Sequence, residues 1–170
     1  MSASEWAEAM RRALERSTGV GVVPVETVRA QSGLEFLRGV AEGRHPRAPI
    51  SDTLAFQLVE VEQGRAVFQG MPAAGHANPM GTVHGGWSAT LLDSAMSCAV
   101  HSTLAAGQGY TTAEFKVSLV RPVLAGRGPL RAEGKVIHVG RTLATSEGRL
   151  YDADGKLYAH GTETCVIFAL

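Results

Sequence analysis

The chain has 170 residues, with 16 basic and 16 acidic side chains and no basic block. This length suits a single domain with its own core, and the balanced charge excludes electrostatic support for a nucleic-acid partner. The first residues mix Glu and Arg with apolar residues, which predicts neither a signal peptide nor a membrane span, so we expect a cytoplasmic protein without membrane association. Cys98 and Cys165 lack metal-ligand spacing and are expected to be reduced core residues.

The N-terminal part is predicted to be helical. Trp6, Met10, Ala13 and Leu14 fall at helical spacing between positions 4 and 17, as in a short amphipathic helix. A second helical stretch is expected from 25 to 42, ended by the prolines of GRHPRAP. We therefore divide the chain into a helical extension, 1–48, and a core domain, 49–170.

Strands are predicted on both sides of a central helix. From 53 to 71 apolar and polar residues alternate around a turn at Gln63-Gly64, as in a hairpin. Four further strands are expected after position 109 in a meander, the last two joined through Asp154-Gly155. This order predicts an α+β domain in which an antiparallel sheet wraps around one helix.

The central helix contains an unusual acid. Residues 87–106 include no Pro, Gly, Lys or Arg, and apolar side chains fall on every face, which predicts a helix that is buried all round. Asp93 lies inside this helix, and no Lys or Arg occurs between Arg65 and Lys116. An unpaired buried carboxylate is costly, so the fold either provides Asp93 with a hydroxyl, amide or cation, or the acid is catalytic.

Two glycines precede this helix. The amides of Gly85 and Gly86 belong to a first turn without intrahelical acceptors and could stabilise an oxyanion; alternatively, the glycines only permit close packing. Gly85 and Asp93 are eight residues apart, about 12 Å along a helix axis. One small carbonyl cannot contact both, so a site that uses both must combine two copies of the chain. We therefore predict a site at a dimer interface.

The runs NPMGTVHGGWSATLLDSAMSCAV and YTTAEFKVSLVRPV, with Gly140-Arg141, resemble a known family. Over about residues 49 to 168 the chain is similar to the hotdog-fold acyl-CoA thioesterases of the PaaI-like (phenylacetate-degradation) group, which are related to 4-hydroxybenzoyl-CoA thioesterases. The resemblance implies a hotdog fold, a homodimer that often pairs into a homotetramer, and hydrolysis of an acyl-CoA to a free acid and coenzyme A. It implies no metal and no cofactor other than the coenzyme A of the substrate.

The resemblance also implies catalytic roles. Gly85 would provide the oxyanion-hole amide, and Asn78 would place the carbonyl or the helix start. Asp93 would act as general base on water or as nucleophile through a transient anhydride. His84 would orient the thioester or, equally well, bond to the backbone at the helix start.

Further residues are implied with less defined roles. Ser97, one turn beyond Asp93, and Thr112 could each hold the carboxylate or the attacking water. The candidates for binding coenzyme A are Gly86, Arg121, Arg127, Gly140 and Arg141, of which the arginines would contact phosphate. An apolar acyl pocket could include side chains that would equally serve as core: Trp87, Leu91 and Met96.

Two other functions fit the sequence. A non-catalytic acyl-CoA sensor could use the same fold, although a carboxylate beside a thioester would serve no purpose in a pure binder. A dehydratase or hydratase would pair His84 with Asp93, which could meet only across subunits. The sequence leaves the acyl group open among aromatic, short-chain and medium-chain acids.

Overall fold

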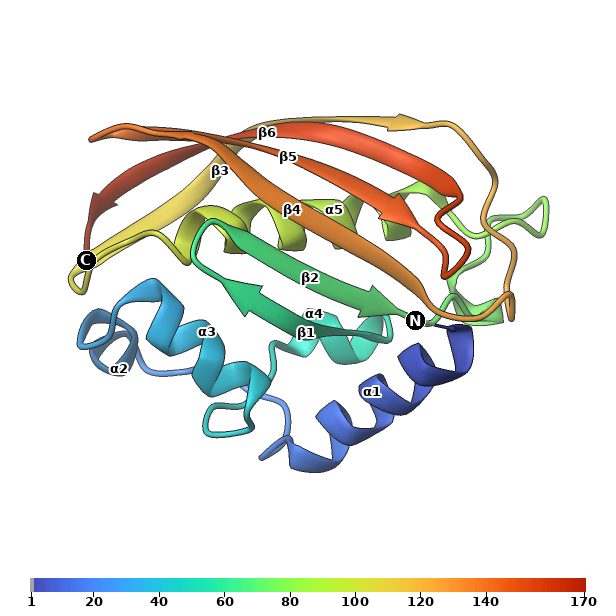
Figure 1. The fold of residues 1–170 in the computed structure, drawn as a ribbon, viewed down its shortest axis with the longest axis horizontal. Helices are drawn as coiled ribbons and strands as arrows, with labels where there is room; N and C mark the ends of the chain where they lie inside the picture. Colours follow the sequence, from blue (N-terminus) through green and yellow to red (C-terminus); the bar gives the residue numbers. More distant parts are fainter. Residues whose placement is uncertain (1) are drawn as a thin grey trace.

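A six-stranded antiparallel sheet curves around one long helix, α5 (Gly85–His101), in the computed structural model, which describes residues 2–170 (Figure 1). The strands are β1 (Phe56–Glu62), β2 (Arg65–Gly70), β3 (Gln108–Leu119), β4 (Leu130–Val139), β5 (Leu143–Tyr151) and β6 (Leu157–Ala169). The predicted α+β class, with a sheet wrapped around one helix, is confirmed.

The strand order is β1-β2-β4-β5-β6-β3. The prediction of a four-strand meander after the helix is therefore wrong for its first strand, because β3 pairs with β6 and not with β4. The helix carries the chain along the concave side of the sheet, so the strand that follows α5 enters at the opposite edge (Figure 1). As a result, β1 and β3 are the two edge strands.

Both predicted hairpin turns are confirmed. Gly64 joins β1 to β2 with a φ of 79°, and Gly155 lies between β5 and β6 with a φ of 77°. Glycine adopts this left-handed region without steric cost. The Asp152 carboxylate supports the second turn by accepting from the amides of Asp154 and Lys156 at 3.1 and 2.9 Å.

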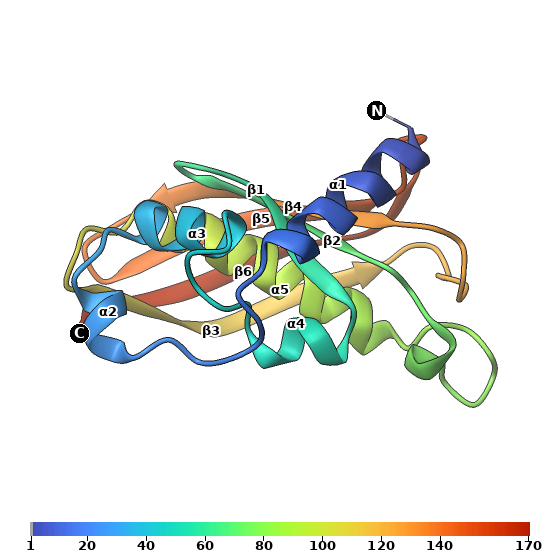
Figure 2. The ribbon, with the colours of Figure 1, turned by 90° about the horizontal axis from the view of Figure 1, so that it is seen from below.

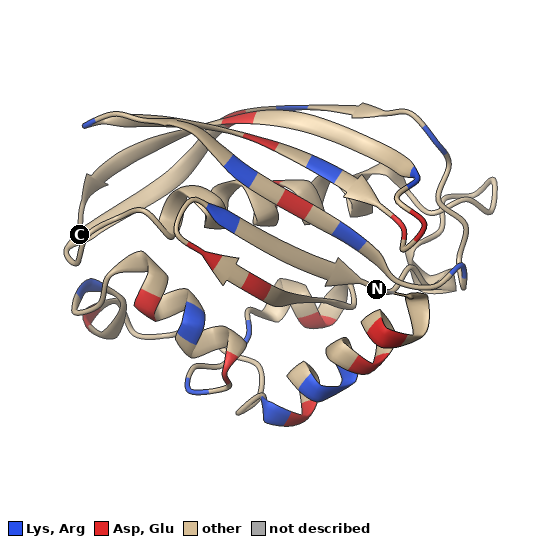
Figure 3. Cartoon of the chain, viewed as in Figure 1, with Lys and Arg blue, Asp and Glu red and all other residues tan. Residues whose placement is uncertain are grey.

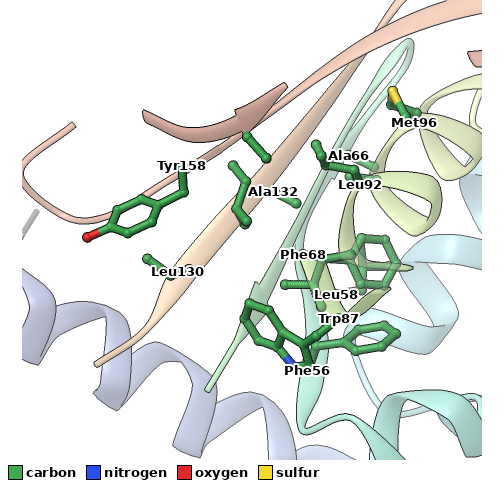
Figure 4. Close-up of a cluster of buried hydrophobic side chains, with 14 of the residues drawn as sticks. Phe56, Leu58, Ala66, Phe68, Trp87, Leu92, Met96, Leu130, Ala132 and Tyr158 are labelled. Carbon is green, nitrogen blue, oxygen red and sulfur yellow. The ribbon is translucent and has the colours of Figure 1, made fainter. Parts of the chain in front are cut away.

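Apolar side chains from the strands and from α5 form the core between sheet and helix (Figure 4). Phe56 and Phe68 meet edge to face with ring centroids 5.8 Å apart. Gly134 of β4 lets the helix approach the sheet, because a Cβ atom there would lie 2.2 Å from the carbonyl oxygen of Ala95. The candidate acyl-pocket residues belong to this core, each at most 3% exposed: Trp87, Leu91 and Met96.

The helix ends earlier and is less covered than predicted. The helix stops at His101. The hydroxyls of Ser102 and Thr103, which follow it, donate to the carbonyls of Ala99 and Val100 in the last turn. One stripe of α5 is only partly buried in the single chain, so the prediction of a helix buried all round is wrong; the stripe comprises Ala89, Thr90, Asp93, Ser94 and Cys98. Both cysteines are free, but only Cys165 is fully buried.

Four helices precede the sheet: α1 (Ala3–Arg16), α2 (Val25–Arg29), α3 (Gly33–Ala41) and α4 (Pro49–Thr53). The first was predicted, but the expected single stretch from 25 to 42 is divided. Ser32 begins a new helix because its hydroxyl and the Glu35 carboxylate form a reciprocal capping box. Figure 2 shows these helices lying across one side of the molecule, over β1 and the open side of the sheet.

Helix α1 is anchored by its buried Trp6. The Arg131 guanidinium lies 4.3 Å from the centre of the Trp6 ring, and the Gln69 amide donates to the Trp6 carbonyl at 2.7 Å. Gln69 in turn accepts from Arg131 at 2.9 Å. The charged side chains are concentrated on these outer helices and on the strands, whereas no Lys or Arg occurs on α5 (Figure 3).

Candidate active site

The start of α5 is held by the loop before it. The Asn78 side chain accepts from the amides of Met80 and Thr82 at 3.0 and 3.3 Å and donates to the Thr82 hydroxyl at 2.8 Å. A backbone bond from Asn78 to the Thr82 carbonyl closes the same loop at 2.8 Å. These bonds order the loop 78–82, which leads into α5.

His84 is the N-cap of α5. Its Nδ1 accepts from the amide of Gly86 at 2.9 Å, so that amide is already bonded. The backbone-bonding alternative for His84 is therefore present, with the ring proton on Nε2. Within residues 2–170 the amide of Gly85 has no acceptor. Of the two glycine donors, Gly85 is the one available to a ligand.

A cavity of about 280 Å³ adjoins this free amide. It is lined by the start of α5, by the loop before it and by the end of β3, including Asn78, Gly85, Ser88, Leu119 and Arg121. Gly85 packs directly on the Leu119 side chain, because a Cβ atom at Gly85 would lie 2.5 Å from its Cδ1. An amide donor, an arginine and an apolar wall thus surround one small cavity.

Asp93 lies elsewhere, beside β3 and β6. Its Oδ1 accepts from the Thr112 hydroxyl at 3.1 Å, and that hydroxyl is also 3.0 Å from Oε1 of Glu163. Burial raises the pKa of Asp93, while the Thr112 hydrogen bond opposes this shift. No ion pair reaches Asp93 within the described part of the chain, so of the partners that the sequence left open the fold provides a hydroxyl, that of Thr112.

Glu163 is the functional candidate that the sequence analysis missed. It is 1% exposed, and burial raises its pKa to about 7. Its Oε1 accepts from the Cys165 thiol at 3.1 Å, whereas its buried Oε2 has no hydrogen-bond partner among residues 2–170. The signal was available, since residues two apart on a strand share a face, and Glu163 lies on the same inward face as Gly161 and Cys165.

Ser97 has a different neighbourhood from the one predicted. It is buried, and no hydrogen bond joins it to Asp93 in residues 2–170. It lies near Cys98 and Tyr110, whose pKa values it influences as a hydrogen-bond partner. Thr112 therefore holds the carboxylate.

The candidate coenzyme A residues separate into two groups. Arg121 lines the cavity at Gly85, and its Nε donates to the Leu157 carbonyl at 3.2 Å. Arg127 lies nearby but is paired with Asp152 at 3.9 Å. In contrast, Gly140 and Arg141 form the turn between β4 and β5, at the far end of the sheet.

The strand register shows how far the Gly140-Arg141 turn lies from the cavity at Gly85. Leu143, just after the turn, is aligned through Val166 with Thr111 near the start of β3, whereas Gly85 packs at Leu119, the end of β3. Eight residues of extended chain between those points span about 26 Å. Arg121 and Arg141 of one copy therefore cannot bind the same phosphate.

The two candidate catalytic groups of one copy are also too far apart to act on the same atom. Gly85 and Asp93 lie on one 17-residue helix and are about 12 Å apart along its axis. In the part of the chain that the structure describes, the stripe that contains Asp93 is only partly buried, and β3 has no second strand partner at its outer edge. Apolar side chains near that edge are exposed, among them Phe115 at 43% and Leu119 at 54%.

Neither a metal site nor a membrane span is evident in the described residues. Positions 2–170 contain no group of three or more His, Cys, Asp or Glu side chains that could hold a metal ion. No helix in this range is long and apolar enough to cross a membrane.

Comparison with protein families and curated sequences gives consistent matches. A family model described as the thioesterase superfamily matches residues 80–159. A Caenorhabditis elegans protein named as an esterase is 36% identical over 107 residues, 62% of this chain and 62% of the nematode protein, less than two thirds of its length. The human protein named acyl-coenzyme A thioesterase 13 is 31% identical over 108 residues, covering 63% of this chain and 76% of the human protein.

Solved structures share the fold. A phenylacetic acid degradation-related protein of Ralstonia eutropha superposes with a TM-score of 0.68 at 29% identity, covering 79% of this chain and 98% of that one. The PaaI phenylacetic acid degradation protein of Thermus thermophilus, in a variant form, gives a TM-score of 0.63 at 28% identity, covering 69% and 97%.

Proposed function

The chain belongs to the thioesterase superfamily, with the hotdog fold of its PaaI-type members, and we propose that it hydrolyses acyl-CoA thioesters at sites shared by two copies. One observation carries the proposal: a helix presents an amide without an acceptor and, about 12 Å further along, a carboxylate without a cation. Hydrolysis needs both a donor for the oxyanion and a base or nucleophile.

The geometry of β3 suggests how two copies combine. Antiparallel pairing of two β3 edges about a two-fold axis at Lys116, with Ala113 as the extra residue of the β-bulge in this strand, puts Leu119 of one copy opposite Thr112 of the other. Leu119 packs on Gly85, and Thr112 donates to Asp93. The free amide of one copy then faces the carboxylate of the other, and the exposed stripe of each α5 becomes covered.

The proposed chemistry uses Gly85 and Asp93 in succession. The Gly85 amide donates to the thioester oxygen as negative charge develops there. As general base, Asp93 takes a proton from the water that attacks the carbonyl carbon, and collapse of the tetrahedral intermediate expels coenzyme A as its thiolate, which takes up that proton. As nucleophile, Asp93 attacks the carbonyl carbon, expels the thiolate, and the resulting anhydride is hydrolysed by water.

Both routes need ionised Asp93, and isotopic labelling of Asp93 would be evidence for the nucleophilic one. In ¹⁸O-labelled water, Asp93 takes up label only if an anhydride forms and water attacks the carbonyl carbon that belongs to Asp93. Mass analysis of the Asp93 peptide after many turnovers detects this route. Label found only in the released acid, after many turnovers, is the result expected both for general-base catalysis and for an anhydride that water attacks at its acyl carbon.

The coenzyme A moiety is proposed to bind between subunits as well. Arg121 adjoins the cavity at Gly85, and the same two-fold pairing brings the Gly140-Arg141 turn of the second copy toward that end. Two arginines from different copies could then bind phosphate, whereas Arg127 is engaged by Asp152. We propose a cytoplasmic location, in keeping with the free thiols and a coenzyme A substrate.

The test is thiol release by the purified protein from benzoyl-, phenylacetyl-, butyryl-, hexanoyl- and lauroyl-CoA, beside the Asp93→Asn variant. Turnover that disappears in the variant supports the proposal and begins to define the acyl group. Binding of these compounds without turnover would favour an acyl-CoA sensor. Turnover that persists in Asp93→Asn would refute the role of the carboxylate.

A further inference from the structure

The chemistry proposed above leaves one buried acid unused. Glu163 lies on β6 with Asp93 and Cys98 facing it from α5, Thr112 from β3, Ser146 aligned with it on β5, and the Cys165 thiol on its own strand. Within residues 2–170 none of these neighbours is a cation, and no Lys, Arg or His forms an ion pair with Glu163. At 1% exposure a charged Glu163 carboxylate would be shielded from solvent, and no cation among residues 2–170 would stabilise it.

The Thr112 hydroxyl lies between two carboxyl groups. Its hydroxyl lies 3.1 Å from Asp93 and 3.0 Å from Glu163, but a hydroxyl carries one hydrogen and can satisfy only one charged carboxylate at a time. Both contacts become hydrogen bonds only if one of the two acids is protonated. The protonated acid then donates to the Thr112 oxygen, and Thr112 donates to the other acid.

We propose that Glu163 holds this proton and acts as a positioning residue, fixing the ionised carboxylate of Asp93 through Thr112. The proposal rests on the proposed function, since it takes Asp93 as the carboxylate that reacts. Burial selects Glu163 for the proton, because it is 1% exposed whereas Asp93 lies on the part-exposed stripe of α5. The unpartnered Oε2 of Glu163 agrees with a neutral acid more readily than with a buried charge.

This arrangement makes activity depend on pH. Burial, with a smaller contribution from the charge of Asp93, raises the pKa of Glu163 to about 7. Above that pH Glu163 loses its proton, the single Thr112 hydrogen is shared by two negative charges, and Asp93 loses a defined orientation. We expect kcat to fall as pH rises through this range, whereas KM should change little because binding does not use Glu163.

The main test is the pH profile of kcat in Glu163→Gln. Its amide can donate to Thr112 at every pH, so the fall should disappear; wild type should lose about tenfold in kcat between about pH 6 and pH 8. Glu163→Leu, which cannot donate, should lower kcat at all pH values, and the contrast between Gln and Leu separates hydrogen bonding from packing. Glu147→Gln, an exposed acid on β5, is the matched control and should keep the wild-type profile. An equal fall in wild type and Glu163→Gln would overturn the proposal.

A second test needs no turnover. Infrared difference spectroscopy of wild type against Glu163→Gln should show a protonated carboxylic acid below about pH 7 that titrates away above it. In Asp93→Asn the midpoint should fall, because the charge that opposes ionisation is removed. A Glu163 that is ionised at pH 6 would overturn the proposal. If the protein hydrolyses no thioester, the proposed function fails separately, and this titration still decides where the proton resides.

Discussion

Complementation between two inactive variants would test the shared site directly. Gly85→Pro removes the amide donor, and Asp93→Asn removes the charge of the carboxylate while retaining its shape. Each variant alone should lose at least about a hundredfold in kcat, the range found when one oxyanion donor is removed. Because Gly85 and Asp93 are about 12 Å apart on one helix, a single copy cannot bring them to the same carbonyl.

The mixed dimer should regain activity. In a dimer of one Gly85→Pro chain and one Asp93→Asn chain, one site receives both intact groups and the other receives both defects. Random exchange between equal amounts of the two variants makes half of the dimers mixed, so about a quarter of wild-type activity should return. The assay is thiol release after unfolding and refolding the variants together, with each refolded alone as control. Activity no higher than the mean of the two separate preparations would refute a site that combines Gly85 of one copy with Asp93 of another.

Three further predictions concern the interface, the ligand and the core. Phe115→Asp, at the centre of the proposed β3 contact, should give monomers in sedimentation velocity and no turnover, whereas Phe168→Asp, equally exposed at 43%, should leave the dimer intact. Arg121→Ala should raise KM about fivefold for an acyl-CoA but not for an acyl-pantetheine, and Arg149→Ala should change neither; equal effects on both substrates would contradict a phosphate contact. Burial lowers the pKa of His101 to about 4, below the usual 6.5, so this group contributes stability that is complete above pH 6.5 and is lost as pH falls toward 4, by up to about 3 kcal/mol. In His101→Phe, denaturant titrations should show that part of the pH dependence removed, and an unchanged loss between pH 6.5 and 4 would contradict it.

Much of the fold follows from local patterns. Period-two alternation and glycine turns predicted both hairpins, and the absence of Pro and Gly predicted the central helix. The position of β3 could not be predicted, because alternation shows that a segment is a strand but not which strand is its neighbour. The break at Ser32 was missed although Ser32 and Glu35 have the spacing of a capping box.

The candidate site was predictable where one local element contains it. Gly85, the N-terminal turn and Asp93 all belong to one helix, so their spacing could be converted to a distance. Glu163 lies 70 positions from Asp93, and only the β3–β6 register brings it to Thr112. The fate of the Gly86 amide likewise depended on the rotamer of His84, which no spacing determines.

The proposed dimer would explain four features of the single chain. The Gly85 amide lacks an acceptor, Asp93 lacks a cation, one stripe of α5 lacks a covering element, and the β3 edge lacks a partner strand, all within residues 2–170. A buried amide or carboxylate without a partner is energetically costly, and an exposed strand edge favours aggregation. The proposed two-fold contact through β3 would cover the stripe and the edge together and would leave the amide of one copy facing the carboxylate of the other. What those two groups then still lack is a polar carbonyl between them, which is what a thioester substrate provides.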